Sequence, residues 1–308
     1  MGLFSKRAKT ADIEPSDAID PIENVTLLAQ LRFGVLGVPV EVDPDTAGLD
    51  TILVASDGLK YPLYNLFVRT ASADADETVD LVMQHVDSMV EARNQPDLTT
   101  LSDDELSTMV RTRIVNRDMT EQIGAKYSIR VAADLVALLC VDFPTHVAWV
   151  NDTQLEGRNV DDLFATGMQN TLAEAVDEVQ HTESGITVIV GDSLFTASKV
   201  LGMQQLLTEH LKPAPHGVLF GVPNRHLIFA LPLADMSSVA AAGTLATMIA
   251  QQANDQENPG GPLSPDVFIW RAGRIERAGG VNPDGTVQMI GDGLMLEALE
   301  ELAAANPR

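Results

Sequence analysis

Apolar and polar positions repeat one plan three times along this chain: two β-rich segments joined by a short turn, followed by an amphipathic helix. Within each helical segment, apolar residues recur every three or four positions, which gathers them on one face. Gly, Pro and Asn separate the paired β-rich segments, where they favour reversal of the chain. The plan therefore predicts paired strands at residues 51–55 and 61–70, 135–142 and 146–150, and 217–222 and 226–233, with helices from about residues 76, 160 and 238.

The stretches around these units carry further signals of secondary structure. Asp74 stands three residues before Glu77, and Asn159 stands three before Asp162, so both are expected to cap the helices that follow. The remaining pattern predicts helices near residues 22–32, 103–110, 196–211 and 294–302, strands near 38–42, 186–190, 266–270 and 274–276, and an exposed loop at 254–265.

This order of elements predicts an α+β fold in which mainly antiparallel sheets are covered by helices. The length of 308 residues and the hydrophobic content of 45% allow a substantial core and more than one domain. We expect a flexible tail at 1–20, an N-terminal α+β subdomain at 21–95, a linker and helix at 96–125, the main α+β domain at 126–278 and an acidic C-terminal extension at 279–308.

The charge of the chain restricts its partners. The formal net charge is −24, so contacts with the phosphates of nucleic acid or anionic lipid would act against the overall field. The sequence has no apolar run of about 18 residues and no apolar signal core near its start. We therefore expect a cytoplasmic protein whose partner is another protein and not a nucleic acid. These features leave the oligomeric state open.

Two charged segments are candidates for contact with partners. Residues 71–106 hold ten acidic residues against the single base Arg93. A solvated surface is the simpler interpretation of this segment, and a face for a basic partner is the alternative. The basic and partly apolar segment Met1–Lys9 predicts at most a weak membrane contact, because Lys6 departs from a myristoylation signal.

Reactive side chains form no specific chemical motif. Cys140, the single cysteine, lies in an apolar run, which predicts a small core residue and not a catalytic thiol. Gly191, Asp192 and Ser193 stand between a predicted strand and helix, where backbone amides attract anions, but the glycine pattern of a phosphate-binding loop is missing. Capping of the helix by Asp192, Ser193 or Thr196 is the simpler interpretation. The six histidines show no close metal-ligand spacing, so we expect neither a metal nor another cofactor.

Arginines supply the remaining candidate contacts to a ligand. The stretch from Arg111 to Arg117 is the most basic of an acidic chain, and its guanidinium groups could pair with phosphate or carboxylate in a cleft. Pairing with acids of the preceding segment is the simpler interpretation, because the net charge leaves surplus carboxylates. Arg225 falls in the third predicted turn, and Arg271 and Arg274 fall on the last predicted strands, where all three are expected to be exposed. No catalytic residue can be assigned; the candidate ligand-binding residues are Asp192, Ser193, Arg113, Arg117 and Arg225.

Five blocks of the sequence carry a resemblance to a known family. They are Asp57-Gly-Leu-Lys-Tyr-Pro-Leu-Tyr-Asn-Leu66, Arg113-Ile-Val-Asn-Arg117, Gly191-Asp-Ser-Leu-Phe-Thr-Ala-Ser-Lys-Val-Leu201, Gly217-Val-Leu-Phe-Gly-Val-Pro-Asn-Arg-His-Leu227 and Asp266-Val-Phe-Ile-Trp-Arg271. Through these blocks the chain resembles the YtpQ-like bacterial proteins of unknown function. The resemblance covers about residues 57–278 and implies an α+β protein, but it implies no activity, since that family has no assigned reaction.

Three functions remain compatible with the sequence. The preferred hypothesis is a noncatalytic binding or adaptor protein that recognises another protein through a sheet edge or an acidic face. The first alternative is an enzyme of small-molecule or phosphate chemistry, with a cleft near Asp192, Ser193 and the arginines Arg113 and Arg117. The second alternative is an adaptor at the membrane surface, which depends on the basic segment Met1–Lys9.

Overall fold

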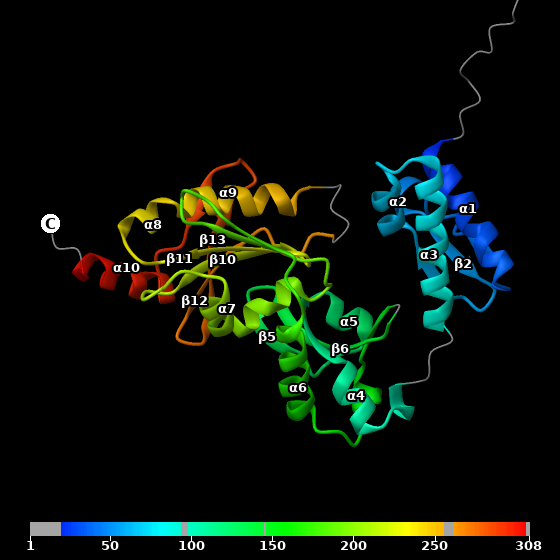
Figure 1. The fold of residues 1–308 in the computed structure, drawn as a ribbon, viewed down its shortest axis with the longest axis horizontal. Coiled ribbons are helices and arrows are strands. Elements are labelled where there is room, and N and C mark those ends of the chain that lie inside the picture. Colours follow the sequence, from blue (N-terminus) through cyan, green and yellow to red (C-terminus); the bar gives the residue numbers. More distant parts are fainter. Residues whose placement is uncertain (1–19, 94–97, 145, 256–260, 306–308) are drawn as a thin grey trace, which may run out of the picture. The chain divides into compact units, whose positions relative to one another are not determined.

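The computed structural model describes residues 20–93, 98–144, 146–255 and 261–305. These residues confirm the predicted α+β fold, because helices alternate with sheets whose described strand pairs are all antiparallel (Figure 1). The chain divides into two compact units, residues 1–90 (unit 1) and 91–308 (unit 2). The basic segment Met1–Lys9 lies outside the described residues, so the membrane hypothesis stays a prediction.

Unit 1 is a three-stranded sheet with helices packed on one face. The strand order is β1-β2-β3, and Phe33, Leu53, Leu66 and Val86 are fully buried between sheet and helices. A hairpin followed by helices thus forms here as predicted. The elements are α1 (Pro21–Val35), β1 (Val40–Val42), the 3-10 turn η1 (Gly48–Asp50), β2 (Ile52–Ala55), β3 (Lys60–Pro62), α2 (Tyr64–Thr70) and α3 (Ala75–Arg93).

The predicted strand at 61–70 is wrong over most of its length. The strand β3 ends at Pro62, which has no N–H group for a ladder, and α2 occupies the rest of the segment. Leu66, Phe67 and Thr70 are buried. Thr70 stands four residues after Leu66 and three after Phe67, so the three side chains lie on one face of a helix. The aromatic and β-branched residues of this segment imitate a strand, but burial of the helical face decides its conformation.

The first sheet of unit 2 is built around β6, which is almost completely buried. The strands β4 and β6 pair over seven residues, while β5 and β7 pair with the other edge of β6. This region contains η2 (Leu98–Thr100), α4 (Asp103–Met109), β4 (Val110–Asn116), α5 (Met119–Ile123), β5 (Ile129–Ala132), β6 (Leu135–Asp142), β7 (Val147–Trp149), η3 (Asp152–Leu155) and α6 (Val160–Ala173).

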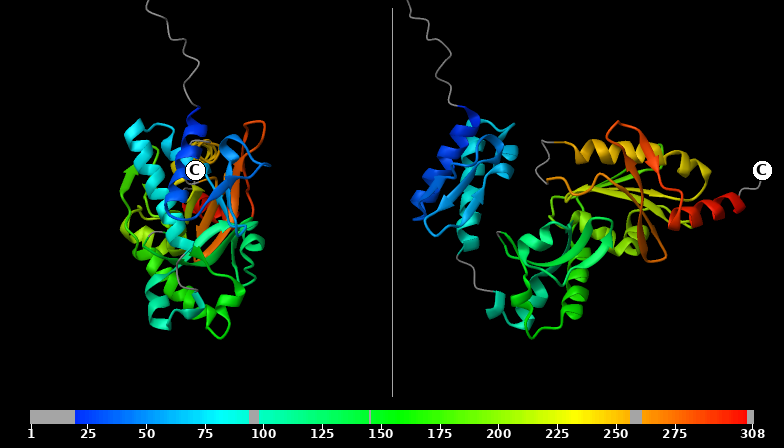
Figure 2. Two further views of the ribbon diagram at one scale, coloured as in Figure 1. Left: turned by 90° about the vertical axis from the view of Figure 1, so that its right-hand side faces the viewer. Right: turned by 180° about the vertical axis from the view of Figure 1, so that it is seen from behind.

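The second sheet of unit 2 has seven strands in the order β14-β13-β12-β10-β11-β9-β8. Figure 2 shows it between layers of helices: α9 packs on one face, and η4 and α7 pack on the other. The elements are β8 (Glu178–His181), β9 (Thr187–Val190), η4 (Thr196–Gly202), α7 (Met203–Glu209), β10 (Val218–Asn224), β11 (Leu227–Pro232), α8 (Met236–Ala240), α9 (Ala242–Ala253), β12 (Val267–Arg271), β13 (Arg274–Val281), β14 (Val287–Met289) and α10 (Gly293–Ala305).

Local signals set several helix boundaries. The Oδ1 atom of Asp74 accepts hydrogen bonds from the amides of Asp76 and Glu77, and Asn159 does the same for the first turn of α6, which confirms both predicted caps. The helix predicted at 196–211 consists of two kinds of helix. Its first half is the 3-10 helix η4, and the α-helix begins only after Gly202, which lies against the side chain of Leu172.

The last part of the chain packs on the second sheet. Helix α10 buries Leu294, Met295, Ala298 and Leu302, and β14 pairs with β13. The predicted boundaries within residues 96–308 stay predictions. No helix in the described part of the chain is long and apolar enough to cross a membrane.

Candidate functional site

A single segment of unit 2, residues 191–198, connects the turn that carries Arg225 with the strand that carries Arg113. The amide of Gly191 donates to the carbonyl of His226 at 3.0 Å, and the amide of Ala197 donates to the carbonyl of Arg225 at 3.0 Å. The amide of Ile114 in β4 donates to Ser198 Oγ at 2.9 Å. The segment thus holds the turn between β10 and β11 beside the edge strand β4.

The turn between β10 and β11 places Arg225 differently from the expectation. The amide of His226 donates to Asn224 Oδ1 at 2.8 Å, which closes the turn predicted at 223–225. Arg225 was expected to be exposed, but it is half-buried because the turn packs on the 191–198 segment. Burial, together with the charge of nearby Arg113, lowers the pKa of Arg225 to about 10.

His226 connects this turn to the loop after β9. Its Nε2 atom accepts a hydrogen bond from Arg225 Nε at 3.0 Å, so the proton of the neutral ring lies on Nδ1. That Nδ1–H group donates to the carbonyl of Gly191 at 3.0 Å. Burial, with the charge of Arg225 adding to it, lowers the pKa of His226, which agrees with a neutral imidazole.

Arg113 lies in β4 with its guanidinium group over an aromatic ring. Its Cζ atom is 5.0 Å from the ring centroid of Trp149 in β7, a cation–π contact that contributes about 1 to 2 kcal/mol. Its Nε atom is buried and has no hydrogen-bond partner among the described residues. Burial lowers the pKa of Arg113. The guanidinium group is therefore held in place on one face while a donor on its edge stays unused.

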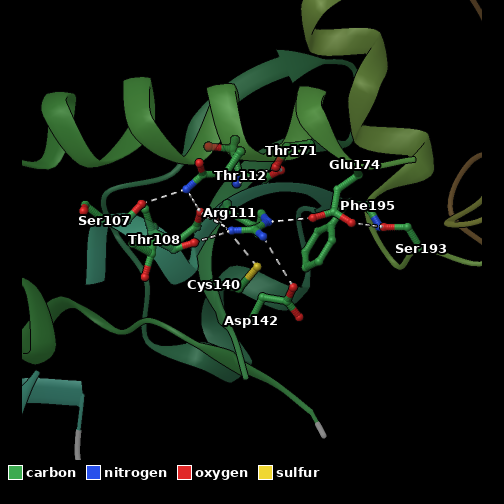
Figure 3. A network of polar contacts seen from close by, with 12 residues as sticks. Ser107, Thr108, Arg111, Thr112, Cys140, Asp142, Thr171, Glu174, Ser193 and Phe195 are labelled. Carbon is green, nitrogen blue, oxygen red and sulfur yellow. Dashed lines mark hydrogen bonds and ion pairs between the residues drawn. The ribbon is translucent and has the colours of Figure 1, made fainter. Parts of the chain in front are cut away.

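Arg111, two residues earlier in β4, has a complete set of partners (Figure 3). Its Nε atom lies 2.8 Å from Glu174 Oε1, its Nη2 atom lies 3.7 Å from Asp142 Oδ2, and its Nη1 atom donates to the carbonyl of Thr108 at 3.0 Å. The expected pairing with acids of residues 71–106 is therefore wrong for Arg111. Asp142 is the last residue of β6 and Glu174 follows α6, so the network connects these two elements with β4.

Ser193 and Asp192 are adjacent in sequence but contact different groups. The hydroxyl of Ser193 donates to Glu174 Oε2 at 3.2 Å and accepts from the amide of Phe195 at 3.2 Å, so it belongs to the Arg111 network. Neither residue caps η4, which begins without a side-chain cap. Arg117 is also separate, because its Nη2 atom donates to the carbonyl of Ala133 at 2.6 Å.

Asp192 faces a groove beside the second sheet. The groove has a volume of about 550 Å³, with apolar side chains from β9 and β11 and a rim of polar groups. His226 forms part of its wall and accepts from Arg225, so the groove lies beside Arg225. The polar lining residues are Asp192, Asn224, His226, Gln252 and Asp255.

Cys140 is the core residue that the sequence predicts. It lies opposite Arg111 in the β4–β6 pairing and opposite Trp149 in the β6–β7 pairing, and it is fully buried. Burial raises the pKa of its thiol to about 12. The sulfur is therefore protonated at neutral pH and is not a nucleophile.

Helix α1 of unit 1 carries apolar residues on two opposite faces. One face packs into the core of unit 1, and the other is open to solvent. The spacing of four on each face shows two separate stripes along the helix. The buried stripe is Val25, Ala29 and Phe33, and the exposed stripe is Leu27, Leu31 and Val35, which are 50%, 59% and 76% exposed. A helix with apolar residues on two opposite faces is typical of a helix covered on both sides, whereas the second stripe of α1 is open to solvent.

The neighbouring helix α3 presents acidic side chains. Asp76, Glu77 and Asp80 are exposed, as the simpler interpretation of residues 71–106 predicts for them. Asp87 connects the two helices, because its carboxylate oxygens lie 2.6 and 2.7 Å from Nε and Nη2 of Arg32 in α1. Arg32 directly follows Leu31, so the apolar stripe and the acidic face lie on adjoining helices (Figure 1).

The structure thus places Arg113 and Arg225 in one cluster with Asp192 close by, and it places Ser193 and Arg117 elsewhere. Sequence reasoning missed Trp149 and His226, for which no motif exists. Among the described residues, no group of three or more His, Cys, Asp or Glu side chains could hold a metal ion. The chain matches no protein-family model, no curated protein and no solved structure with which it was compared.

Proposed function

We propose that the protein is a noncatalytic binding or adaptor protein that docks a basic amphipathic helix of another protein on unit 1. The observation that carries the proposal is the exposed apolar stripe Leu27, Leu31 and Val35 on α1. The acidic face of α3 adjoins it and specifies the charge of the partner. A partner helix would set its leucines on the stripe and its lysines or arginines against Asp76 and Asp80.

The competing enzyme proposal has less support. It needs Asp192, Ser193, Arg113 and Arg117 in one cleft, whereas Ser193 contacts Glu174 and Arg117 contacts Ala133. We therefore favour a binding function, in the cytoplasm, and propose that the resemblance to YtpQ-like proteins reflects common descent.

The first test measures binding of a synthetic helix with leucines at helical spacing and lysines at the other positions, by fluorescence anisotropy. Leu31→Glu should raise the Kd at least tenfold, because burying one leucine contributes about 1.5 to 3 kcal/mol. The matched control is Leu59→Glu, which adds the same charge at a leucine that is 47% exposed outside the stripe. Its Kd should stay within about twofold of the wild-type value.

Equal effects of L31E and L59E would contradict the proposal, because they would show that only the overall charge attracts the peptide. Circular dichroism of both variants checks that unit 1 stays folded. Added salt should weaken binding of the wild type and of L59E to the same degree, since the α3 carboxylates are unchanged in both.

A further inference from the structure

Arg113 in unit 2 has an unusual environment for a cation in this chain. Several other arginines have carboxylate partners: Arg32 pairs with Asp87, Arg111 with Glu174 and Asp142, and Arg277 with Asp266. Arg113 has no ion pair with a carboxylate within the described ranges, and its buried Nε atom has no acceptor. This occurs in a protein with 44 acidic and 20 basic residues, where acids are in excess.

The titratable groups whose charge is coupled to that of Arg113 are Cys140, Arg225 and His226, and none of them supplies a negative charge. Cys140 is protonated, because burial raises the pKa of its thiol to about 12. His226 is neutral, and Arg225 adds a second positive charge. Burying a cation without an anion is costly, so the arrangement favours an anion from solution.

The edge of the guanidinium group is the part that remains for a ligand. Trp149 covers one face of Arg113, which fixes the plane of the group. The side chains of Arg113, Trp149 and Arg225 are each half-buried. The Nε atom of Arg113 is itself buried, so a ligand from solution would meet the Nη groups first.

We propose that Arg113, supported by Trp149 and flanked by Arg225, binds a small carboxylate. A carboxylate has two oxygens in one plane, which match the paired Nη donors at the end of a guanidinium group. The flat apolar surface of Trp149 favours an aromatic or unsaturated acid. The net charge of −24 repels polyanions, so the ligand is a small acid and not a nucleic acid. This site is independent of the proposed docking surface on unit 1.

The test uses benzoate as the probe and the emission of Trp149 as the signal. The chain has two tryptophans, so Trp270→Phe isolates Trp149. Benzoate should change the emission in a saturable manner and raise the Tm, whereas benzyl alcohol, which lacks the charge, should do neither. Inorganic phosphate is the competing anion. Saturable binding of phosphate with no binding of benzoate would overturn the carboxylate assignment.

Two substitutions separate a ligand contact from a structural role. Arg113→Gln should raise the Kd for benzoate at least about tenfold, since it removes the paired charged donors. Arg130→Gln is the matched control, because Arg130 is an exposed arginine of the same sheet, in β5. Its Kd should stay within about twofold of the wild-type value.

Arg113→Met supplies a readout that does not depend on the ligand. The substitution removes the cost of burying an unpaired cation, which we expect to exceed the loss of the contact with Trp149, so the Tm of the ligand-free protein should rise and the increase caused by benzoate should be abolished. A lower Tm of R113M without ligand would show that Arg113 stabilises the fold through partners of its own. That result, or equal benzoate affinity in R113Q and R130Q, would overturn the proposal.

Discussion

At the residue scale, the pH dependence of stability that Asp142 causes is a test of the Arg111 network. Burial raises the pKa of Asp142 above its ordinary value; the charge of Arg111 opposes this shift, and Glu174 adds to it. Between the ordinary pKa and the raised one, the folded state binds more protons than the unfolded state. The free energy of unfolding therefore falls as the pH rises through this interval, from about 4 upward.

Asp142→Asn should remove this dependence. The difference in free energy of unfolding between D142N and the wild type should increase as the pH rises from about 4, and it should level off above the folded pKa. Urea unfolding at several pH values measures it. Glu183→Gln is the control, because Glu183 is an exposed residue of the turn before β9. A difference that falls with pH would show that pairing with Arg111 outweighs burial.

The spacing of residues predicts part of this chemistry. Arg111 and Arg113 are two positions apart, so a strand puts them on the same face, and the sequence places them together as candidates. Arg111 and Arg113 nevertheless make different contacts, because their partners are distant in the chain. Glu174 follows α6 and Trp149 lies in β7, and no local pattern links either of them to β4. Because acidic residues are in excess, each arginine is predicted to form an ion pair with a carboxylate. This prediction holds for Arg111 and fails for Arg113.

At the element scale, Gly221 lets α9 pack closely on the second sheet. A Cβ atom at this position of β10 would collide with the side chain of Ile249 in α9. Gly221→Ala should lower the free energy of unfolding by about 1 to 3 kcal/mol, as overpacking of a core does. Chemical denaturation monitored by circular dichroism measures this change.

The control for Gly221 lies in the same pair of elements. Gly243 belongs to α9, and a Cβ atom there would meet nothing within 4 Å. Gly243→Ala should raise the free energy of unfolding by about 0.5 to 1 kcal/mol, because alanine loses less chain entropy in a helix. If both substitutions stabilise the protein, α9 does not pack on β10 as closely as the structure shows.

Some elements have a strong period of apolar residues along the sequence, and others do not. The helices α3, α6 and α9 repeat apolar residues every three or four positions, and each forms near its predicted start. The segments of α2 and η4 are short, and there burial in the assembled unit overrides local preference. The closeness of the β10–β11 turn to β4 is a tertiary effect, so no sequence pattern could predict the arginine cluster.

At the scale of the whole molecule, the two units have separate cores. The buried cluster of unit 1 is formed only by residues between Val25 and Val90, and it includes both sheet and helix residues. The buried clusters of unit 2 begin at Leu98. A unit with its own core is expected to fold alone when it exceeds about 55 residues.

We therefore expect a fragment of residues 20–93 to fold cooperatively. It retains the cap of α1, where Asp20 Oδ1 accepts from the amide of Ile22 at 2.8 Å, and all of α3. Thermal unfolding of the fragment should give one sigmoidal transition, and Leu66→Ala should destabilise the fragment by about 2 to 5 kcal/mol.

In the full chain, L66A should shift the unfolding transition of unit 1, and G221A should shift a separate transition of unit 2. A single transition that both substitutions shift equally would show that the units unfold together, and a fragment that unfolds gradually would show that unit 1 depends on the rest of the chain.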